Sequence, residues 1–447
     1  MQQKKIVDDP LLRGFFRQWY NIYFICLKVM KEHYPKIVHL KNGIKVWYIP
    51  NYRSALLNVG FWTLGGGSME TNNTLEYYHF LEHMVCDFTS TKYPDGRQNN
   101  KTLKTMGVDL QGEVDDDTMH IWMEGHERAA DLMLDMLMNT ILDYKLDATR
   151  FEGERESIIT ELQGYQNDPF NALDEFREKT LYKTHPIAKT LDERIASVKK
   201  ATPESLTAFF PRAVVADRII VYVSGNLPSP KKHLHRLCYA LAKLPKRVPL
   251  LSVDVLHSYM PPYVKPGLRK IKLDANQTDR TDIVWKVHLN EFNDDYAIFD
   301  AFEMIFNTKL FDLLRIQKGL IYHVNIDSRY DAINRHISYF AIELEVNNKK
   351  SIQPTIDSTL EFIRTVDITE TDLLQCKREE TNRYEQSRLD LVQLDYAWDY
   401  VPSLLLNETL TLAKAQHNRF QTLSLHEIKA AMRKYLQVSE AYIFVGQ

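Results

Sequence analysis

Cysteine is scarce in this chain. Its four cysteines (Cys26, Cys86, Cys238 and Cys376) are scattered through 447 residues without any Cys-x-x-Cys pair. This spacing argues against both a disulfide framework and a cysteine-built metal site, and it favours a reducing compartment. We therefore expect an intracellular protein and assign it to the cytoplasm, with import into an organelle left open as the alternative.

Long apolar runs are also missing. The most apolar stretch lies within residues 1–34, where Arg17 and Lys28 bracket about ten apolar residues, whereas a bilayer span needs roughly 20. An acidic pair, Asp8-Asp9, precedes this stretch, which argues against a secretory signal. We expect residues 1–34 to form an N-terminal extension that docks as an amphipathic helix, with a targeting role as the alternative. The sequence predicts no membrane span.

An excess of positive charge is the third absence. The formal net charge is −3, from 56 Lys and Arg against 59 Asp and Glu. No basic field is therefore available to recruit nucleic acid, and we expect none as a partner. Apolar residues make up 44% and charged residues 26%, as in a globular protein. Because 447 residues exceed one ordinary core, we expect more than one domain.

Helical and alternating patterns occur in a similar order in the two halves of the chain. An alternating hairpin surrounds Asn42-Gly43, which is a strong turn signal. Proline-rich residues 246–268 resemble an inter-domain linker. The sequence therefore predicts an α+β protein of two duplicated domains, residues 35–245 and 269–447, built on antiparallel-rich sheets.

The run His79-Phe80-Leu81-Glu82-His83 carries a metal-site pattern. Positions i and i+4 lie on one face of a helix, so His79 and His83 can bind one ion. Glu82 flanks that face and is placed to take a proton from a water held by zinc. This is the inverted H-x-x-E-H motif. An exposed helix face carrying two histidines is the alternative, since so short a pattern also arises by chance.

A second cluster lies downstream, in Glu154-Arg155-Glu156-Ser157-Ile158-Ile159-Thr160-Glu161. Glu154 and Glu161 are two helical turns apart and share one face. Glu161 is the candidate third ligand, which leaves a fourth position open for water, and Glu154 is a candidate partner for a histidine N–H. Without the histidines, the same glutamates would be read as a solvated helix face.

These motifs, with Gly67-Ser68-Met69-Glu70 and His185-Pro186, resemble the pitrilysin-like (M16-type) family of inverted-motif zinc peptidases. The family includes insulin-degrading enzymes and mitochondrial processing peptidases, and the resemblance covers nearly the whole chain after residue 35. It implies helices packed on one face of each sheet and one Zn²⁺ per chain, bound by His79, His83 and Glu161. It also implies peptide or presequence hydrolysis by attack of a zinc-bound water, with Glu82 as general base.

The segment Leu314-Arg315-Ile316-Gln317-Lys318-Gly319-Leu320-Ile321-Tyr322 is similar to a further part of that family. The resemblance implies that Arg315 and Tyr322 act in catalysis, reaching the active site from the opposite half to bind substrate and the developing oxyanion. For chains of this length it implies a clam-like homodimer, or a heterodimer with a paralogue. Without the zinc motif, Arg315 would be read as a residue on a solvated helix end.

Two departures concern the substrate. Leu110-Gln111-Gly112-Glu113 stands where the family commonly has an Asn-Ala edge strand. Binding by strand addition uses backbone groups, so Gln111 and Gly112 remain expected substrate contacts. The acidic run Asp115-Asp116-Asp117 is interpreted as a solvated turn, with attraction of basic peptides as the alternative.

A rival function remains open. A protein of the same fold can serve as a catalytically silent scaffold or as a peptide-binding subunit, since fold does not imply function. All four of His79, Glu82, His83 and Glu161 are present, which favours the enzyme.

Overall fold

The computed structural model describes residues 36–166, 168, 170–252, 255, 259–273, 279–289, 295–330, 335–389 and 412–447. The N-terminal extension expected for residues 1–34 lies outside these ranges, as does part of the predicted linker. Within the described residues, no helix combines the length and the apolar content that crossing a bilayer would require.

The first half of the chain forms a six-stranded sheet in the order β1-β2-β6-β3-β5-β4. All neighbours pair antiparallel except β2 and β6. The predicted hairpin joins β1 to β2, and Gly43 takes the positive φ of 102° that its turn requires. The strands are Lys36–His39 (β1), Lys45–Pro50 (β2), Leu56–Leu64 (β3), Asp109–Val114 (β4), Thr118–His126 (β5) and Ile219–Gly225 (β6).

The second half forms a five-stranded sheet in the order β7-β11-β8-β10-β9. Here β7 and β11 are parallel and the remaining pairs are antiparallel. The prediction of an α+β protein with two antiparallel-rich sheets is confirmed. The strands are Gly267–Ile271 (β7), Arg280–Lys286 (β8), Ile321–Arg329 (β9), Tyr339–Val346 (β10) and Tyr442–Gly446 (β11).

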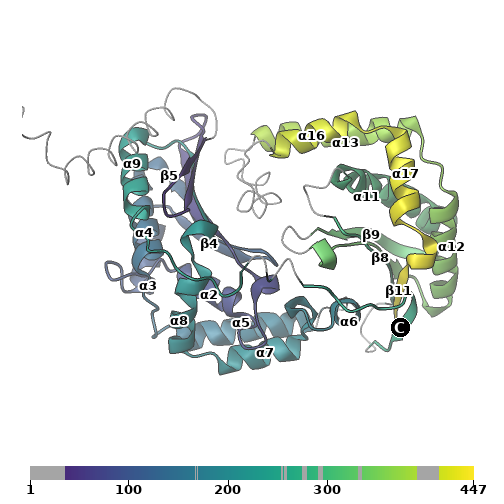
Figure 1. The fold of residues 1–447 in the computed structure, drawn as a ribbon, viewed down its shortest axis with the longest axis horizontal. Helices are drawn as coiled ribbons and strands as arrows, with labels where there is room; N and C mark the ends of the chain where they lie inside the picture. Colours follow the sequence, from purple (N-terminus) through teal and green to yellow (C-terminus); the bar gives the residue numbers. More distant parts are fainter. Residues whose placement is uncertain are drawn as a thin grey trace, which may run out of the picture.

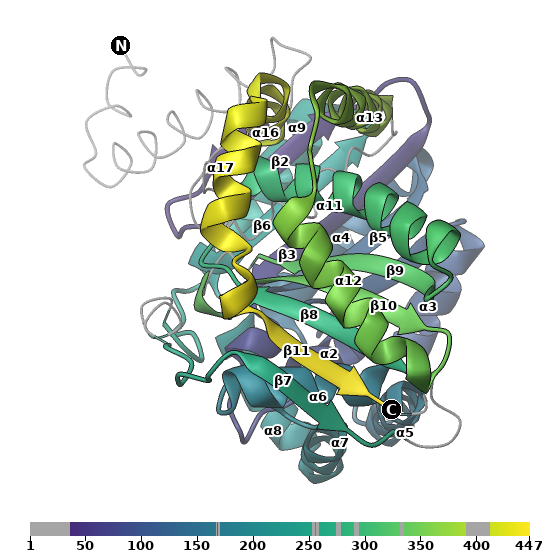
Figure 2. The ribbon, with the colours of Figure 1, turned by 90° about the vertical axis from the view of Figure 1, so that its right-hand side faces the viewer.

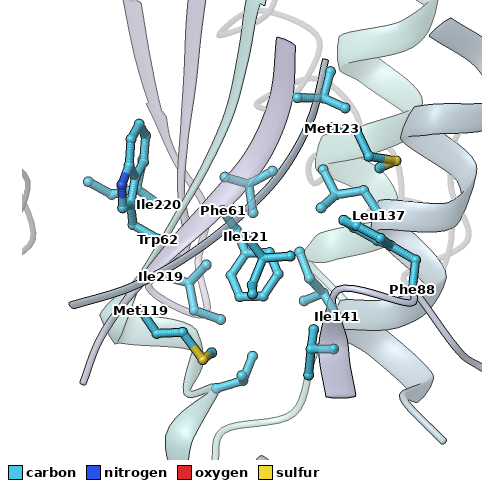
Figure 3. Close-up of a cluster of buried hydrophobic side chains, with 14 of the residues drawn as sticks. Phe61, Trp62, Phe88, Met119, Ile121, Met123, Leu137, Ile141, Ile219 and Ile220 are labelled. Atoms are coloured by element: carbon cyan, nitrogen blue, oxygen red, sulfur yellow. The ribbon is translucent and has the colours of Figure 1, made fainter. Parts of the chain in front are cut away.

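Most helices of the first half pack on its sheet through alternating strand residues. Neighbouring residues of a strand point to opposite faces, and Figure 3 shows Phe61 and Ile121 near Leu137 and Ile141 of α4, with Trp62 on the other side. The helices are Tyr77–Val85 (α2), Gly96–Thr105 (α3), Ala130–Asp143 (α4), Phe151–Gln166 (α5), Asn171–Tyr182 (α6), Leu191–Lys200 (α7), Pro203–Ala213 (α8) and Pro230–Leu241 (α9).

Helices of the second half cover one face of its sheet. Figures 1 and 2 show α11, α12 and α17 on the side that points away from the first half. Phe299 and Phe302 of α11 pack there against Phe340 of β10. The helices are Tyr296–Leu310 (α11), which continues as a π-helix Phe311–Gln317 (η5), Ile352–Thr365 (α12), Glu370–Leu389 (α13), Leu412–Thr422 (α16) and Leu425–Tyr435 (α17).

Helix α6 joins the two halves, which lie side by side (Figure 1). It follows α5 in the chain, yet its buried Leu173 and Tyr182 share a core with Ala341 and Phe444 of the second sheet. Arg177 of α6 also donates to Asp282 Oδ2 on β8 at 3.0 Å. The second sheet is therefore connected to the first half by a core that it shares with α6, as well as by the chain itself.

Candidate metal centre

Helix α2 carries both histidines of the inverted motif. Its other face is buried and includes Tyr78, Leu81 and Val85. That burial leaves His79 and His83 on the face that points toward α5. Phe80 of α2 stacks on Phe151 at the start of α5, with ring centroids 4.6 Å apart, so the contact between the two helices begins beside the site.

Three donor atoms from α2 and α5 converge. His79 Nε2 lies 3.2 Å from Glu161 Oε2, and His83 Nε2 lies 3.6 Å from the same oxygen. In a tetrahedral zinc site with bonds of about 2.0–2.2 Å, neighbouring donor atoms are about 3.3–3.6 Å apart. The spacing and the donor types, two imidazoles and a carboxylate, therefore fit zinc.

The opposite nitrogen of each histidine is held by a carboxylate. His79 Nδ1 lies 2.9 Å from Glu76 Oε2, and His83 Nδ1 lies 3.1 Å from Glu154 Oε2. When Nδ1 carries the proton, it donates to the carboxylate and leaves the Nε2 lone pair for a metal. The structure thus brings Glu154 to the position that its spacing from Glu161 suggested.

Glu76 was missed by the sequence analysis. It lies three residues before His79, a helical spacing that could have pointed to it. Arg194 donates to Glu76 at 2.6 Å. Burial acts to raise the pKa of Glu76, but His79 and Arg194 outweigh it and lower that pKa to about 2.

Neighbouring charges also favour the charged forms of His79 and Glu154. Burial opposes protonation of His79, yet Glu76, Glu82 and Glu161 together raise its pKa. The hydrogen bond to His83 lowers the pKa of Glu154, with a further contribution from Arg150, against the effect of burial. Both carboxylates that hold the histidines are therefore kept ionised.

Glu82 lies beside the converging donors. One of its carboxylate oxygens is within 4.8 Å of a ring nitrogen of each histidine, and its Oε2 lies 3.7 Å from His83 Nε2. Its other oxygen accepts from Cys86 Sγ at 3.2 Å. Gly112 of β4 faces it closely, because a Cβ there would lie 2.0 Å from Glu82 Oε1.

The two histidines, Glu82 and Glu161 line a cavity of about 700 Å³. Gly112 is among its lining residues and Gln111 is not, so only one of the two expected substrate contacts faces it. Both residues lie on β4, which is one of the two edge strands of its sheet. Acidic side chains dominate the lining, which contains Glu70, Glu76, Glu82, Glu113, Asp115, Asp116, Glu161, Asp174, Glu175 and Glu178 against the cations Lys189 and Arg194.

The interpretation of Asp115-Asp116-Asp117 as a solvated turn is wrong for two of its residues. Asp117 is buried, and Asp116 forms an ion pair with Arg329 of β9 in the second half. Backbone groups of this turn also accept from Gly65, Gly67 and Ser68. The turn is therefore packed into the cavity wall.

Arg315 and Tyr322 lie together in the second half, and neither lines this cavity. The Arg315 guanidinium sits over the Tyr322 ring, 4.6 Å from its centroid, and donates to the Tyr322 carbonyl at 2.9 Å. Tyr322 is 65% exposed. Within one chain, the structure thus joins the pair to each other but not to the histidines.

Comparisons with known proteins agree with this geometry. The family described as insulinase (peptidase family M16) matches residues 46–193, and the family described as peptidase M16 inactive domain matches residues 200–379. The first match contains His79, Glu82, His83 and Glu161, and the second contains Arg315 and Tyr322.

Two curated relatives are similar over part of their length. The mitochondrial-processing peptidase subunit beta of Neurospora crassa is 23% identical over 52% of this chain and 48% of its own. An uncharacterized zinc protease of Mycobacterium leprae is 26% identical over 42% of each chain. The matches thus span about half the length of these relatives or less.

A protease from Helicobacter pylori has a similar solved structure. It superposes with a TM-score of 0.77 at 18% identity, covering 92% of this chain and 99% of that one. At this identity the similarity supports the fold alone, and the motifs and the two family matches carry the rest. By its two-domain α+β fold and by both matches, this chain belongs to the peptidase M16 family.

Proposed function

We propose that this protein is a zinc-dependent endopeptidase that hydrolyses peptides or presequences. The observation that carries the proposal is the approach of His79 Nε2 and His83 Nε2 to Glu161 Oε2, at 3.2 and 3.6 Å, with Glu82 beside the two histidines. When bound, zinc would act as a Lewis acid that activates water and polarises the scissile carbonyl.

Residues of the chain itself would transfer the proton and bind the peptide. Glu82 takes the proton from the attacking water and then passes it to the leaving amine. The exposed backbone of the edge strand β4 at Gln111 and Gly112 pairs with an extended peptide. Four of the ten carboxylates in the lining, Glu76, Asp116, Asp174 and Glu178, already pair with arginines. The acidic groups that remain still exceed the cations, so the cavity favours peptides that carry positive charge.

The test is Glu82→Gln. This variant should keep one zinc per chain and lose peptide cleavage by about 10²–10⁴-fold, because only the proton acceptor is removed. Glu113→Gln, at an exposed carboxylate of the same cavity, is the matched control and should retain most of the activity. Full cleavage by Glu82→Gln would refute the proposed mechanism.

The rival is a scaffold or peptide-binding subunit. It is favoured by the description of the family that matches residues 200–379 as an inactive domain. A purified chain that takes up no zinc at micromolar concentrations of the ion would support the scaffold. Zinc uptake together with chelator-sensitive digestion of a peptide library would support the enzyme.

We further propose a homodimer, or a heterodimer with a paralogue, in which Arg315 and Tyr322 of one subunit complete the site of the other. The exposure of Tyr322, together with its neighbours Phe311 and Ile316, supports an interface there. Mixing an Arg315→Ala chain with a Glu82→Gln chain should restore activity above that of either alone. No restoration in a preparation shown to exchange subunits would exclude the shared site.

A further inference from the structure

A second cavity, of about 830 Å³, lies between α3 and the first turns of α5. It shares no lining residue with the cavity around the histidines. Its volume is within the range of small-molecule sites, about 300–1,000 Å³. Of its lining residues, the proposed peptidase site uses only Glu154, which holds His83.

The charge of this cavity is opposite to that of the first. Its lining contains the cations Arg97, Lys101, Lys104 and Arg150 and a single carboxylate, Glu154, so the formal net charge is +3. Glu154 already pairs with Arg150 and His83. The chain as a whole carries −3, so this positive region is a local feature.

Three of the cations form one row on α3. Arg97, Lys101 and Lys104 stand at helical positions i, i+4 and i+7, which share one face. All three are exposed, and among the described residues none of them forms an ion pair. Glu154 in the lining and Asp87, which accepts from Asn100 of the lining, are both paired with Arg150 instead. In the part of the chain that the structure describes, the three positive charges therefore have no acidic partner.

The dimensions of the row suggest what would neutralise it. Seven residues of α-helix rise about 10 Å, a length that one phosphate cannot span and a short chain of linked phosphates can. Ser157 on the α5 wall adds a hydroxyl donor facing the same space. Lysine and arginine together are the side chains that proteins use for multiply charged phosphates.

We propose that the cavity between α3 and α5 binds a linear phosphate polyanion, such as an inorganic oligophosphate or the phosphate chain of a nucleotide. The row on α3 contacts successive phosphates, and Ser157 donates to one of them. This site is independent of whether the protein cleaves peptides.

The test is calorimetric titration of the zinc-loaded protein with sodium tripolyphosphate at low ionic strength. We expect one saturable site whose affinity falls at least tenfold in the double variant Lys101→Gln/Lys104→Gln. The double variant Lys349→Gln/Lys350→Gln is the matched control, because it removes the same charge from exposed positions of the other half. Chelation of zinc by the ligand contributes equally to both variants, since they share the metal centre.

The outcomes separate cleanly. Equal weakening in both double variants would reduce the effect to general electrostatics and overturn the proposal, as would the absence of saturable binding. Selective weakening at Lys101 and Lys104 supports it. A parallel titration with ATP then identifies the source: equal affinity assigns the site to the phosphate chain alone, and tighter binding of ATP assigns it to a nucleotide.

Discussion

At the residue scale, the absence of a side chain at Gly112 allows β4 to approach the proposed catalytic base. A Cβ at this position would lie 2.0 Å from Glu82 Oε1 and 2.4 Å from Cys86 Sγ, both far inside van der Waals contact. Something must therefore move, and the Glu82 carboxylate is the end of a flexible side chain.

We expect Gly112→Ala to lower kcat/KM by about 10²-fold, since a displacement of the base near 1 Å has an effect of that size. Zinc content should stay unchanged, because no donor atom is touched. The matched control is Gly164→Ala in α5, where an added Cβ meets nothing within 4 Å. Steady-state kinetics and metal analysis check both variants, and normal kinetics in Gly112→Ala would contradict the close approach.

His185 provides a pH prediction at the same scale. Its buried ring accepts from Ile187 N–H through Nδ1. Burial, with a further contribution from Arg329 and against the effect of Asp116, lowers its pKa to about 4. Because the folded pKa lies below the unfolded value near 6.5, the unfolded state takes up the proton first as pH falls.

Stability should therefore be unaffected by His185 above pH 6.5 and decline between pH 6.5 and 4, by up to about 3 kcal/mol. Asparagine keeps an acceptor but does not titrate. In His185→Asn, the slope of the unfolding free energy against pH should therefore be smaller by the contribution of about one proton. Urea unfolding in chelator, across that pH range, measures it, with the exposed His426→Asn as control. Parallel declines in the wild type and in His185→Asn would contradict the prediction.

The sequence predicted the candidate metal ligands, but it did not predict the residues that pack around them. His79 and His83 could be paired because their spacing alone places them on one helix face, and Glu161 followed from a second helical spacing. The contacts of Glu82 with Gly112 and Cys86 could not be predicted, because they depend on how β4 docks against α2. The same holds for Arg194, which reaches Glu76 across 118 residues.

At the scale of elements, α2 and α5 form the frame of the proposed metal centre. Helical spacing predicted both, but it did not predict where α2 begins, which is at Tyr77. Glu76 adopts a left-handed φ of 66°, because the Glu70 carboxylate accepts from its N–H at 2.7 Å and from that of Tyr78 at 3.0 Å. A buried side chain distant from the pattern thus fixes where the helix starts.

The N-terminal end of α2 supplies Glu76 to His79, and the N-terminal end of α5 supplies Glu154 to His83. The effects of the two carboxylates on zinc binding can therefore be compared directly. We expect Glu76→Gln and Glu154→Gln each to raise the dissociation constant for zinc by about 10–100-fold, through loss of the charge that orients the imidazole. Competition with a chromophoric chelator at constant pH measures it. Glu156→Gln, exposed on α5, should change nothing, and an equal effect there would assign the loss to general charge.

At the scale of the whole molecule, the duplicated order of strands and helices predicted two sheets, but not how they are joined. An amphipathic pattern shows which face of a helix is apolar and not which sheet will cover it. Helix α6 follows the metal-site helix in sequence and packs on the second sheet. Its Arg177 donates to Asp282 at 3.0 Å and to Glu343 at 2.7 Å, so one cation joins α6 to β8 and β10.

Arg177→Met should therefore destabilise the protein by about 3–5 kcal/mol, because it leaves the buried carboxylates Asp282 and Glu343 with one cation, Arg280, in place of two. Arg177 is 4% exposed and Asp282 is fully buried. Arg364→Met is the matched control, since the pair of Arg364 with Glu361 is more than half exposed on both sides and such pairs contribute at most about 1 kcal/mol. Urea titrations of both variants measure the difference. Similar small losses in the two would mean that the apolar contacts of α6, rather than this arginine, hold the halves together.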